Sequence, residues 1–328
     1  MSTPASTWSK TRPGSAGAAS DFAPDVRSGL SKSQKELHSK YLYDELGSAL
    51  FEAITHLPEY GLTRADERVL VGHAGEIAER AGQPAMVVEL GSGTGRKTRA
   101  ILSALSRQNQ EIRYYPIDVS PDALNRCRRE LSDVATVHSL SHTYLTGLSL
   151  ATAARRHGEP ILLLFLGSTI GNFERPYALE FLRDVRSRLA PGDALLIGAD
   201  LVKDTAMMLA AYDDPTGVTA AFNLNLLGRV NRELDANFDL TQFTHEARWN
   251  ERERRIEMHL RSRVDQVAEV PGAGLTVRMR AGETIWTESS HKFGAAELFA
   301  MAERTGFEGV AQWTDAEWPF AESLWTAL

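Results

Sequence analysis

The sequence predicts an α/β fold in which a parallel sheet presents a ligand site at the carboxyl ends of its strands. The apolar run Met86–Leu90 leads directly into a turn with glycines at 91, 93 and 95. A second β-rich segment, 112–120, has an acid near its end, Asp118, and a third, 160–166, is the most strongly apolar of the chain. Short continuous apolar runs are typical of buried parallel strands. Open α/β sheets bind ligands beyond the carboxyl ends of such strands.

Three kinds of ligand-binding glycine-rich turn are candidates for residues 89–97. A phosphate-binding loop requires Gly immediately before Lys97, and a dinucleotide fingerprint requires Gly or Ala at its third conserved position, but Arg96 occupies both places. The pattern of S-adenosylmethionine-dependent methyltransferases, an acid followed by three alternating glycines, is matched in full by Glu89–Gly95. A tight turn without a ligand is the alternative. The residues that we assign to a cofactor site on this pattern are Glu89, Gly91 and Gly93.

An acid at the end of the second strand favours an adenosine ligand. Asp118 lies at the spacing at which a nucleotide-binding βαβ unit places the carboxylate that accepts hydrogen bonds from ribose hydroxyls. Ser120 and Pro121 already supply the N-cap and the first residue of the next helix. Because a cap is present, Asp118 is available for a ligand.

The length, charge and cysteine content of the chain limit the kinds of partner that it can have. The chain has 328 residues, is 43% hydrophobic and carries a net charge of −7, which suits one large or two unequal domains and argues against a nucleic-acid-backbone binder. Its single cysteine, Cys127, permits no internal disulfide, and no apolar run reaches membrane-spanning length or resembles a signal peptide. We expect a soluble cytoplasmic protein with a small-molecule substrate and without a membrane or nucleic-acid partner.

No metal is expected, because His138 and His142 lack a third ligand. A monomer is compatible with the sequence.

The first 60 residues precede the predicted sheet. Residues 1–20 are rich in Ser, Ala, Gly and Thr, which predicts a disordered tail. Helical spacing begins at Asp21, and a further amphipathic helix ends at Pro58. Tyr60 follows in a bend flanked by Pro and Gly. Composition favours a packing role for this ring over one facing a cleft.

The strand 160–166 runs straight into Gly167–Phe173. The carboxyl end of such a strand would face the group transferred by a cofactor, so Asn172 is either a turn residue or a ligand for a substrate carboxylate or amine. Residues 194–200 form the next buried strand.

The βα alternation breaks between Lys203 and about Ser290. Two helical segments, 207–212 and 218–233, precede alternating β segments at 244–249, 255–263, 266–270 and 275–289. This pattern predicts an inserted α+β lobe. We expect a cofactor-binding domain of residues 61–202 plus 291–328 and a substrate-binding lobe of residues 21–60 plus 203–290.

With these residues assembled, the chain from about Asp21 to its end resembles the histidine-specific, S-adenosylmethionine-dependent methyltransferases of ergothioneine biosynthesis. The most specific segments are 57–60, 165–172, 200–204, 211–223, 255–258 and 287–293. The resemblance implies a class I methyltransferase domain with a Rossmann-like sheet and the inserted lobe. It also implies trimethylation of the α-amine of L-histidine to hercynine.

The resemblance assigns roles to individual residues. It implies that Tyr60, Asn172 and Tyr212 hold the carboxylate and amine of the substrate, whereas Glu288 and Ser290 hold the two imidazole nitrogens. On the cofactor side, Gly91, Lys97 and Asp118 match the contact positions of the family. Neutral hydroxyls and an amide suit a product that becomes cationic, whereas an apposed Lys or Arg would repel it.

The chain departs from the family pattern in two places. Gly61 stands where many relatives carry a second tyrosine, which is expected to loosen the lip of the substrate cleft. The segment Leu140–Tyr144 lacks the acid that faces adenine in relatives, so we assign none.

Three other functions account for part of the sequence pattern. An α-amine methyltransferase of another aromatic amino acid, such as tryptophan, is disfavoured by the Glu288 and Ser290 pair, since an indole offers one N–H group. A nicotinamide oxidoreductase is disfavoured by Arg96. A methyltransferase-like binding protein without chemistry remains the non-enzymatic alternative.

Overall fold

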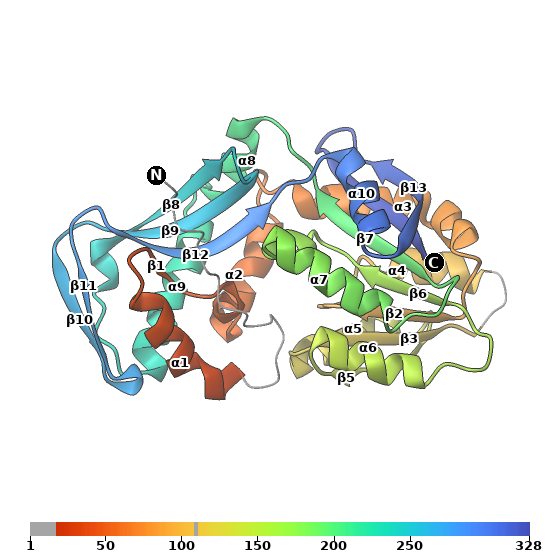
Figure 1. The fold of residues 1–328 in the computed structure, drawn as a ribbon, viewed down its shortest axis with the longest axis horizontal. Coiled ribbons are helices and arrows are strands. Elements are labelled where there is room, and N and C mark those ends of the chain that lie inside the picture. The colour runs from red at the N-terminus through yellow and green to blue at the C-terminus, as the bar shows by residue number, and fades with distance from the viewer. Residues whose placement is uncertain (1–17, 108–110) are drawn as a thin grey trace.

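The computed structural model describes residues 18–107 and 111–328, which fold into two parts around two sheets (Figure 1). Most of the predicted disordered tail, residues 1–17, lies outside the described residues. Helix α1 (Ala18–Leu30) includes the last three residues of the predicted tail, 18–20. Its start combines alanines, which have the highest helix propensity, with Asp21 in the first turn.

An eight-stranded sheet forms the larger part. Its strand order is β13-β14-β7-β6-β2-β3-β4, and β5 also pairs with β3. The strands from β4 to β7 pair in parallel, whereas β14 pairs antiparallel with both β7 and β13. The predicted parallel sheet is therefore confirmed, with an antiparallel edge. The strands are β2 (Met86–Leu90), β3 (Arg113–Asp118), β4 (Thr136–Val137), β5 (Leu140–Ser141), β6 (Ile161–Phe165), β7 (Ala194–Asp200), β13 (Phe307–Thr314) and β14 (Phe320–Ala327).

Helices cover both faces of this sheet. Alternate strand residues point to opposite faces, so Val88 packs in one apolar core and Val87 in the other. One face is covered by α6 (Tyr144–Ala153), α7 (Arg175–Arg186) and α10 (Ala295–Arg304). The opposite face is covered by α3 (Leu62–Arg80), α4 (Arg99–Ser106) and α5 (Pro121–Leu131). These three layers form the Rossmann-like α/β architecture that the sequence predicts.

The smaller part contains a four-stranded sheet of order β1-β12-β9-β8 and a separate hairpin, β10–β11. Its own apolar core includes residues of α1, α2, α9 and β9. The remaining elements are β1 (Lys35–Glu36), η1 (Ser39–Leu42), α2 (Glu45–Thr55), η2 (Thr169–Asn172), α8 (Thr205–Tyr212), α9 (Val218–Glu233), η3 (Leu240–Gln242), β8 (Phe243–Asn250), β9 (Arg255–Ser262), β10 (Gln266–Val270), η4 (Pro271–Ala273), β11 (Leu275–Met279) and β12 (Thr284–His291).

The two parts meet where β12 ends. The segment η2, which follows β6, contacts both β12 and β7. The bond from the Phe293 amide to the Asp200 carbonyl, 3.0 Å, joins the chain after β12 to the end of β7. The carboxyl ends of β6 and β7 therefore face the smaller part. No helix among the described residues has the length and apolar character needed to cross a membrane.

Candidate functional site

The glycine turn after β2 leaves open space at its centre. Gly93 has a φ of +51°, and a Cβ added there would meet no atom within 4 Å. Gly95, with a φ of +73°, packs differently, because an added Cβ would lie 2.7 Å from Cys127 Sγ. Gly91 also has a positive φ of +74°, and an added Cβ would lie 3.2 Å from the Tyr144 hydroxyl. The turn thus packs closely at both ends and is open at Gly93.

The two sequence-predicted acids of this region have different surroundings. Asp118 accepts hydrogen bonds from the Gly93 amide at 3.1 Å and the Ser120 amide at 2.9 Å, so its carboxylate joins the turns after β2 and β3. Glu89 is buried and accepts from Thr98 Oγ1 at 2.7 Å and from the Tyr114 hydroxyl. Burial raises the pKa of Glu89 to about 7.

Lys97 belongs to a buried charge cluster behind the turn. Its ammonium pairs with Asp66 of α3, and the same Asp66 oxygen accepts from the Gly167 amide at 3.1 Å. Burial acts to lower the pKa of Lys97. The negative charge and the hydrogen bond of Asp66 act in the opposite direction, and the net effect is a raised pKa. Burial and the nearby Asp66 raise the pKa of Glu322 in β14 well above its usual range. The cluster connects the glycine turn to the turn after β6.

The predicted substrate residues gather at the junction of the two parts. The rings of Tyr60 and Tyr212 lie 6.2 Å apart between centroids, and the Tyr212 hydroxyl lies 2.7 Å from Ser290 Oγ. Glu288 and Ser290 are two residues apart on β12, which places their side chains on one face of the strand. All four residues are at most 8% exposed. Burial raises the pKa of Glu288 to about 7, although the nearby Lys292 opposes the shift.

Asn172 ends η2, the segment that packs against β12. Gly171 makes this approach possible, because a Cβ added there would lie 2.8 Å from the His291 carbonyl oxygen. Ser168, with a φ of +57°, starts η2, and its Oγ accepts from the Asp200 amide at 2.9 Å. The loop that carries Asn172 is thus fixed to the ends of β7 and β12. Asn172 itself is half-buried.

Sequence reasoning missed a buried ion pair at the centre of this group. The Lys292 ammonium lies 2.8 Å from Asp200 Oδ2 and donates to the Tyr212 hydroxyl at 2.9 Å. The ammonium of a lysine thus lies among the predicted substrate residues. Asp200 supplies a compensating negative charge: burial acts to raise its pKa, but Lys292 and Lys203 together lower it. Asp200 and Lys292 both lie in segments on which the family resemblance rests, 200–204 and 287–293. Membership of these segments is the only sequence feature that could have pointed to the pair.

Tyr43, at the end of η1, is a second residue that the sequence did not single out. Its ring contacts Phe51 and Phe222, with centroids 5.4 and 5.6 Å away. The residue is 40% exposed overall, but burial of its hydroxyl end and the charge of Glu288 raise its pKa well above the usual range. Tyr43 therefore adds a third neutral hydroxyl near Glu288.

Gly61 does not loosen the lip of the site as expected. A Cβ on Gly61 would lie 2.6 Å from Trp318 Cδ2, so the indole occupies the space that a larger side chain would need. The Trp318 indole N–H donates to Asp200 Oδ1 at 2.9 Å. The missing side chain is replaced by Trp318, which is 7% exposed.

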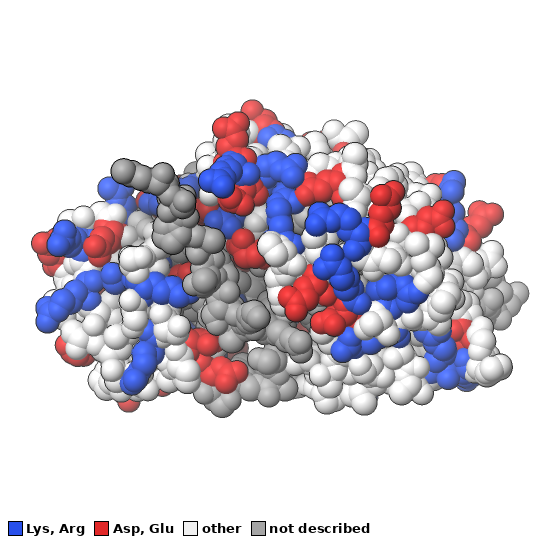
Figure 2. Space-filling model, in the orientation of Figure 1, with Lys and Arg blue, Asp and Glu red and all other residues white. Residues whose placement is uncertain are grey.

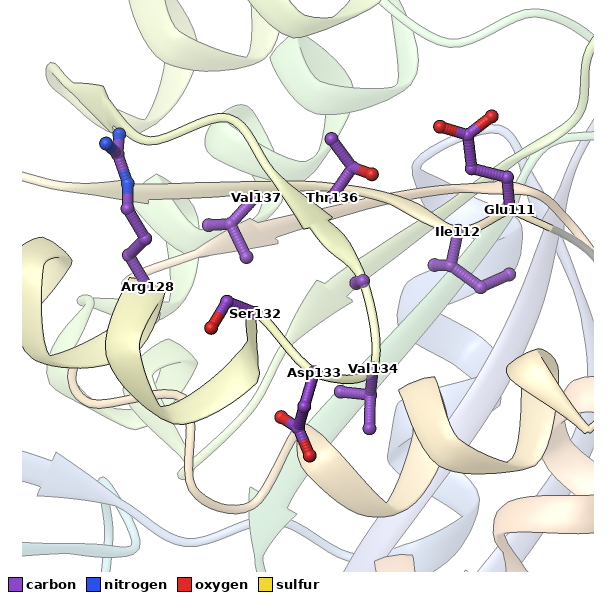
Figure 3. A pocket seen from close by; sticks show the side chains of 9 residues that line it. Glu111, Ile112, Arg128, Ser132, Asp133, Val134, Thr136 and Val137 are labelled. Carbon is purple, nitrogen blue, oxygen red and sulfur yellow. The ribbon is translucent and has the colours of Figure 1, made fainter.

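A separate pocket of about 530 Å³ lies at the opposite edge of the large sheet (Figure 3). It is lined by Ile112, which precedes β3, by the end of α5 and by β4. These are the amino ends of parallel strands, away from the glycine turn.

Within the described residues, no group of three or more His, Cys, Asp or Glu side chains could hold a metal ion.

The chain is similar to known proteins over most of its length. Residues 22–327 match the family described as histidine-specific methyltransferase, SAM-dependent. The chain is 43% identical over 92% of its length to the histidine N-alpha-methyltransferase of Mycobacterium tuberculosis, covering 93% of that protein. It is 42% identical over 94% of its length to the enzyme of the same name from Mycolicibacterium smegmatis, covering 95% of it. Ergothioneine biosynthesis protein 1 of Neurospora crassa is 34% identical over 85% of this chain, which covers 32% of the fungal protein. The chain belongs to the histidine-specific, S-adenosylmethionine-dependent methyltransferase family.

Proposed function

We propose that this protein transfers methyl groups from S-adenosylmethionine to the α-amine of L-histidine, up to three times, to give hercynine for ergothioneine biosynthesis. The observation that carries the proposal is the buried pair of Glu288 and Ser290 on one face of β12, beside the hydroxyls of Tyr60 and Tyr212. This pair offers hydrogen-bonding groups for the two imidazole nitrogens. Family membership supplies the reaction class.

The residues around the glycine turn fit S-adenosylmethionine. Gly93 borders open space in which a Cβ would meet nothing. The Asp118 carboxylate accepts two backbone hydrogen bonds and retains lone pairs for ribose hydroxyls. The Lys97 ammonium has donors to spare beyond its pair with Asp66 and suits the cofactor carboxylate. In this proposal, residues 61–202 plus 291–328 bind the cofactor, and residues 21–60 plus 203–290 form the substrate lobe.

The chemistry requires a neutral amine held in line with the transferred group. Bound S-adenosylmethionine supplies a methyl group activated by its sulfonium. An α-amine has an ordinary pKa of about 7.7–8.0, so it loses its proton readily near neutral pH. Burial raises the pKa values of Tyr60 and Tyr212 well above their usual range, so both hydroxyls remain neutral. Their role is to position the amine and carboxylate, since alignment of reactants supplies much of the rate.

The other parts of the proposal concern partners. A small-molecule substrate suits the charge pattern, because Lys and Arg side chains are interspersed with Asp and Glu on the face shown in Figure 2. A cytoplasmic monomer that contacts neither membrane nor nucleic acid is part of the same proposal. The single Cys127 suits a reducing compartment.

Replacement of Glu288 tests the imidazole-reading role. Glu288→Ala removes one of the two ring contacts, so kcat/KM for histidine should fall at least about tenfold, as expected when a substrate N–H loses its buried acceptor. Release of S-adenosylhomocysteine measures the rate. Glu283→Ala, which removes an exposed acid just before the same strand, is the control and should leave kcat/KM unchanged. Equal rates for Glu288→Ala and wild type would contradict the assignment.

A further inference from the structure

The Lys292 ammonium donates two hydrogen bonds and forms one ion pair within the protein. The side chain is fully buried, and its Nζ donates to the Tyr212 hydroxyl at 2.9 Å and to Ser290 Oγ at 3.0 Å. The third partner is Asp200 Oδ2 at 2.8 Å. Its backbone is also held, since its amide donates to the Arg254 carbonyl at 2.7 Å. A lysine can donate but cannot accept, so both hydroxyl oxygens must act as acceptors toward Lys292.

The bond between the two hydroxyls then has a preferred direction. Tyr212 and Ser290 lie 2.7 Å apart, and one of them must donate to the other. The phenol is the more acidic group and therefore the better donor. Its oxygen is the poorer acceptor and already accepts from Lys292. Ser290 Oγ has two lone pairs, which match the two donors, Tyr212 and Lys292.

With both lone pairs occupied, Ser290 can only donate its own proton to a third group. Ser290 and Glu288 share a face of β12, so that proton points to the space that Glu288 also borders. We propose that Lys292 fixes Ser290 as a hydrogen-bond donor toward the substrate ring, so that the site selects a neutral ring with an unprotonated nitrogen opposite Ser290 and an N–H group opposite Glu288. The inference deepens the proposed function and rests on it. Lys292 is a positioning residue, because it acts through Ser290.

The donor assignment separates histidine from rings with a single N–H group. A ring that offers N–H to Glu288 but only C–H to Ser290 leaves a buried donor without a partner, which is costly. An indole is such a ring. The opposite direction of the Tyr212–Ser290 bond would make Ser290 an acceptor, and a ring nitrogen lone pair facing it would then be repelled.

Neutral histidine analogues distinguish the two directions. β-(1,2,4-Triazol-3-yl)-L-alanine keeps nitrogens at both imidazole positions and has a mobile proton, whereas the pyrrol-2-yl and pyrrol-3-yl alanines carry only an N–H group at one position or the other. Dissociation constants would be measured by calorimetry on the full chain saturated with S-adenosylhomocysteine. The triazole should bind within about tenfold of histidine, and both pyrroles at least about tenfold more weakly than the triazole. A pyrrole that binds as tightly as the triazole, or more tightly, would overturn the inference.

Two lysines on the same carboxylate provide a matched pair of variants. Lys203 also pairs with Asp200, through Oδ1, and its ammonium further contacts the Leu201 carbonyl and the Trp318 ring, but none of these contacts is to Tyr212 or Ser290. Lys292→Met frees a lone pair on Ser290, so the triazole-to-pyrrole preference should shrink at least about fivefold. Lys203→Met removes a cation from the same Asp200 and should leave the preference unchanged. Equal effects of the two variants on the preference, or no effect of Lys292→Met, would contradict the role of Lys292.

A further variant keeps the test decisive if Lys292→Met does not fold. Ser290→Ala retains the Lys292–Asp200 pair and removes the proposed donor, so the triazole and the tighter-binding of the two pyrroles, which keeps its N–H opposite Glu288, should bind with similar affinity. A preference that survives in Ser290→Ala would overturn the inference. If wild type binds and methylates histidine but prefers the pyrroles, the inference alone is wrong. If wild type neither binds nor methylates histidine, the proposed function is wrong as well.

Discussion

At the scale of single residues, Gly61 illustrates how the site adapts to a departure from the family pattern. The Trp318 ring occupies the space next to Gly61, and its N–H group donates to Asp200. The Lys203 ammonium lies 4.6 Å from the centre of the same ring. Gly61 has an ordinary helical φ of −72°. The glycine is therefore required for space and not for backbone conformation.

Replacement of Gly61 tests this steric role. Gly61→Ala forces the new Cβ against Trp318 and should lower the free energy of unfolding by about 1–3 kcal/mol, the usual cost of overpacking. Urea denaturation measures the change. Gly72→Ala, at a helical position where a Cβ meets nothing within 4 Å, is the control and should raise stability by about 0.5–1 kcal/mol. A Gly61→Ala variant as stable as wild type would show that Trp318 can move aside.

The residue scale also shows what the sequence could not predict. The family resemblance assigned five residues to the substrate, Tyr60, Asn172, Tyr212, Glu288 and Ser290. The structure buries all of these except the half-buried Asn172 and brings Tyr60, Tyr212 and Ser290 close together. The resemblance did not identify Lys292 as their partner, because a lysine in isolation is expected in solvent. The contact with Asp200 depends on how β7 and β12 meet, and sequence spacing carries no information on that.

At the scale of elements, β2 carries an acid in its buried interior. Glu89 has a folded pKa of about 7, above its ordinary value of 4.5, because it is buried. The native state therefore binds more protons than the unfolded state between these values, so stability falls as pH rises from about 4.5 to 7. The difference of about 2.5 pKa units corresponds to about 3 kcal/mol.

A neutral isostere at this position should remove that pH dependence. Glu89→Gln can still accept from Thr98 and Tyr114, so its stability relative to wild type should rise by up to about 3 kcal/mol between pH 4.5 and 8. Chemical denaturation at the two pH values measures the difference. A stability difference that is the same at both pH values would contradict the elevated pKa of Glu89.

Element prediction succeeded where apolar runs are continuous. The segments around β2, β3, β6 and β7 are confirmed as strands, because burial on both faces makes them apolar throughout. The single β segment predicted at 275–289 is wrong. It is divided into β11 and β12 by a turn in which Gly282 has a φ of +87°. The β-rich run 134–140, which by itself indicates one strand, forms only the two-residue strands β4 and β5. Local propensity could not reveal either break, since both depend on which strand supplies the pairing partner.

At the scale of the whole molecule, β12 connects the two halves of the site. It begins in the small sheet between β1 and β9 and ends beside η2, where Lys292 reaches Asp200 of the large sheet (Figure 1). The two residues proposed to hold the imidazole and the lysine proposed to fix Ser290 thus lie on one continuous segment, 288–292. The sequence predicted two lobes from the break in βα alternation, but not that a single strand would join their binding groups.

The central claim is that this arrangement methylates the α-amine of histidine. The most direct measurement is mass spectrometry of the purified protein incubated with S-adenosylmethionine and an equal mixture of histidine and tryptophan. The proposed function predicts a mass gain of three methyl groups on histidine and none on tryptophan. Methylated tryptophan with unmodified histidine would contradict the assignment of Glu288 and Ser290, and an absence of any methylated product would contradict the enzymatic function itself.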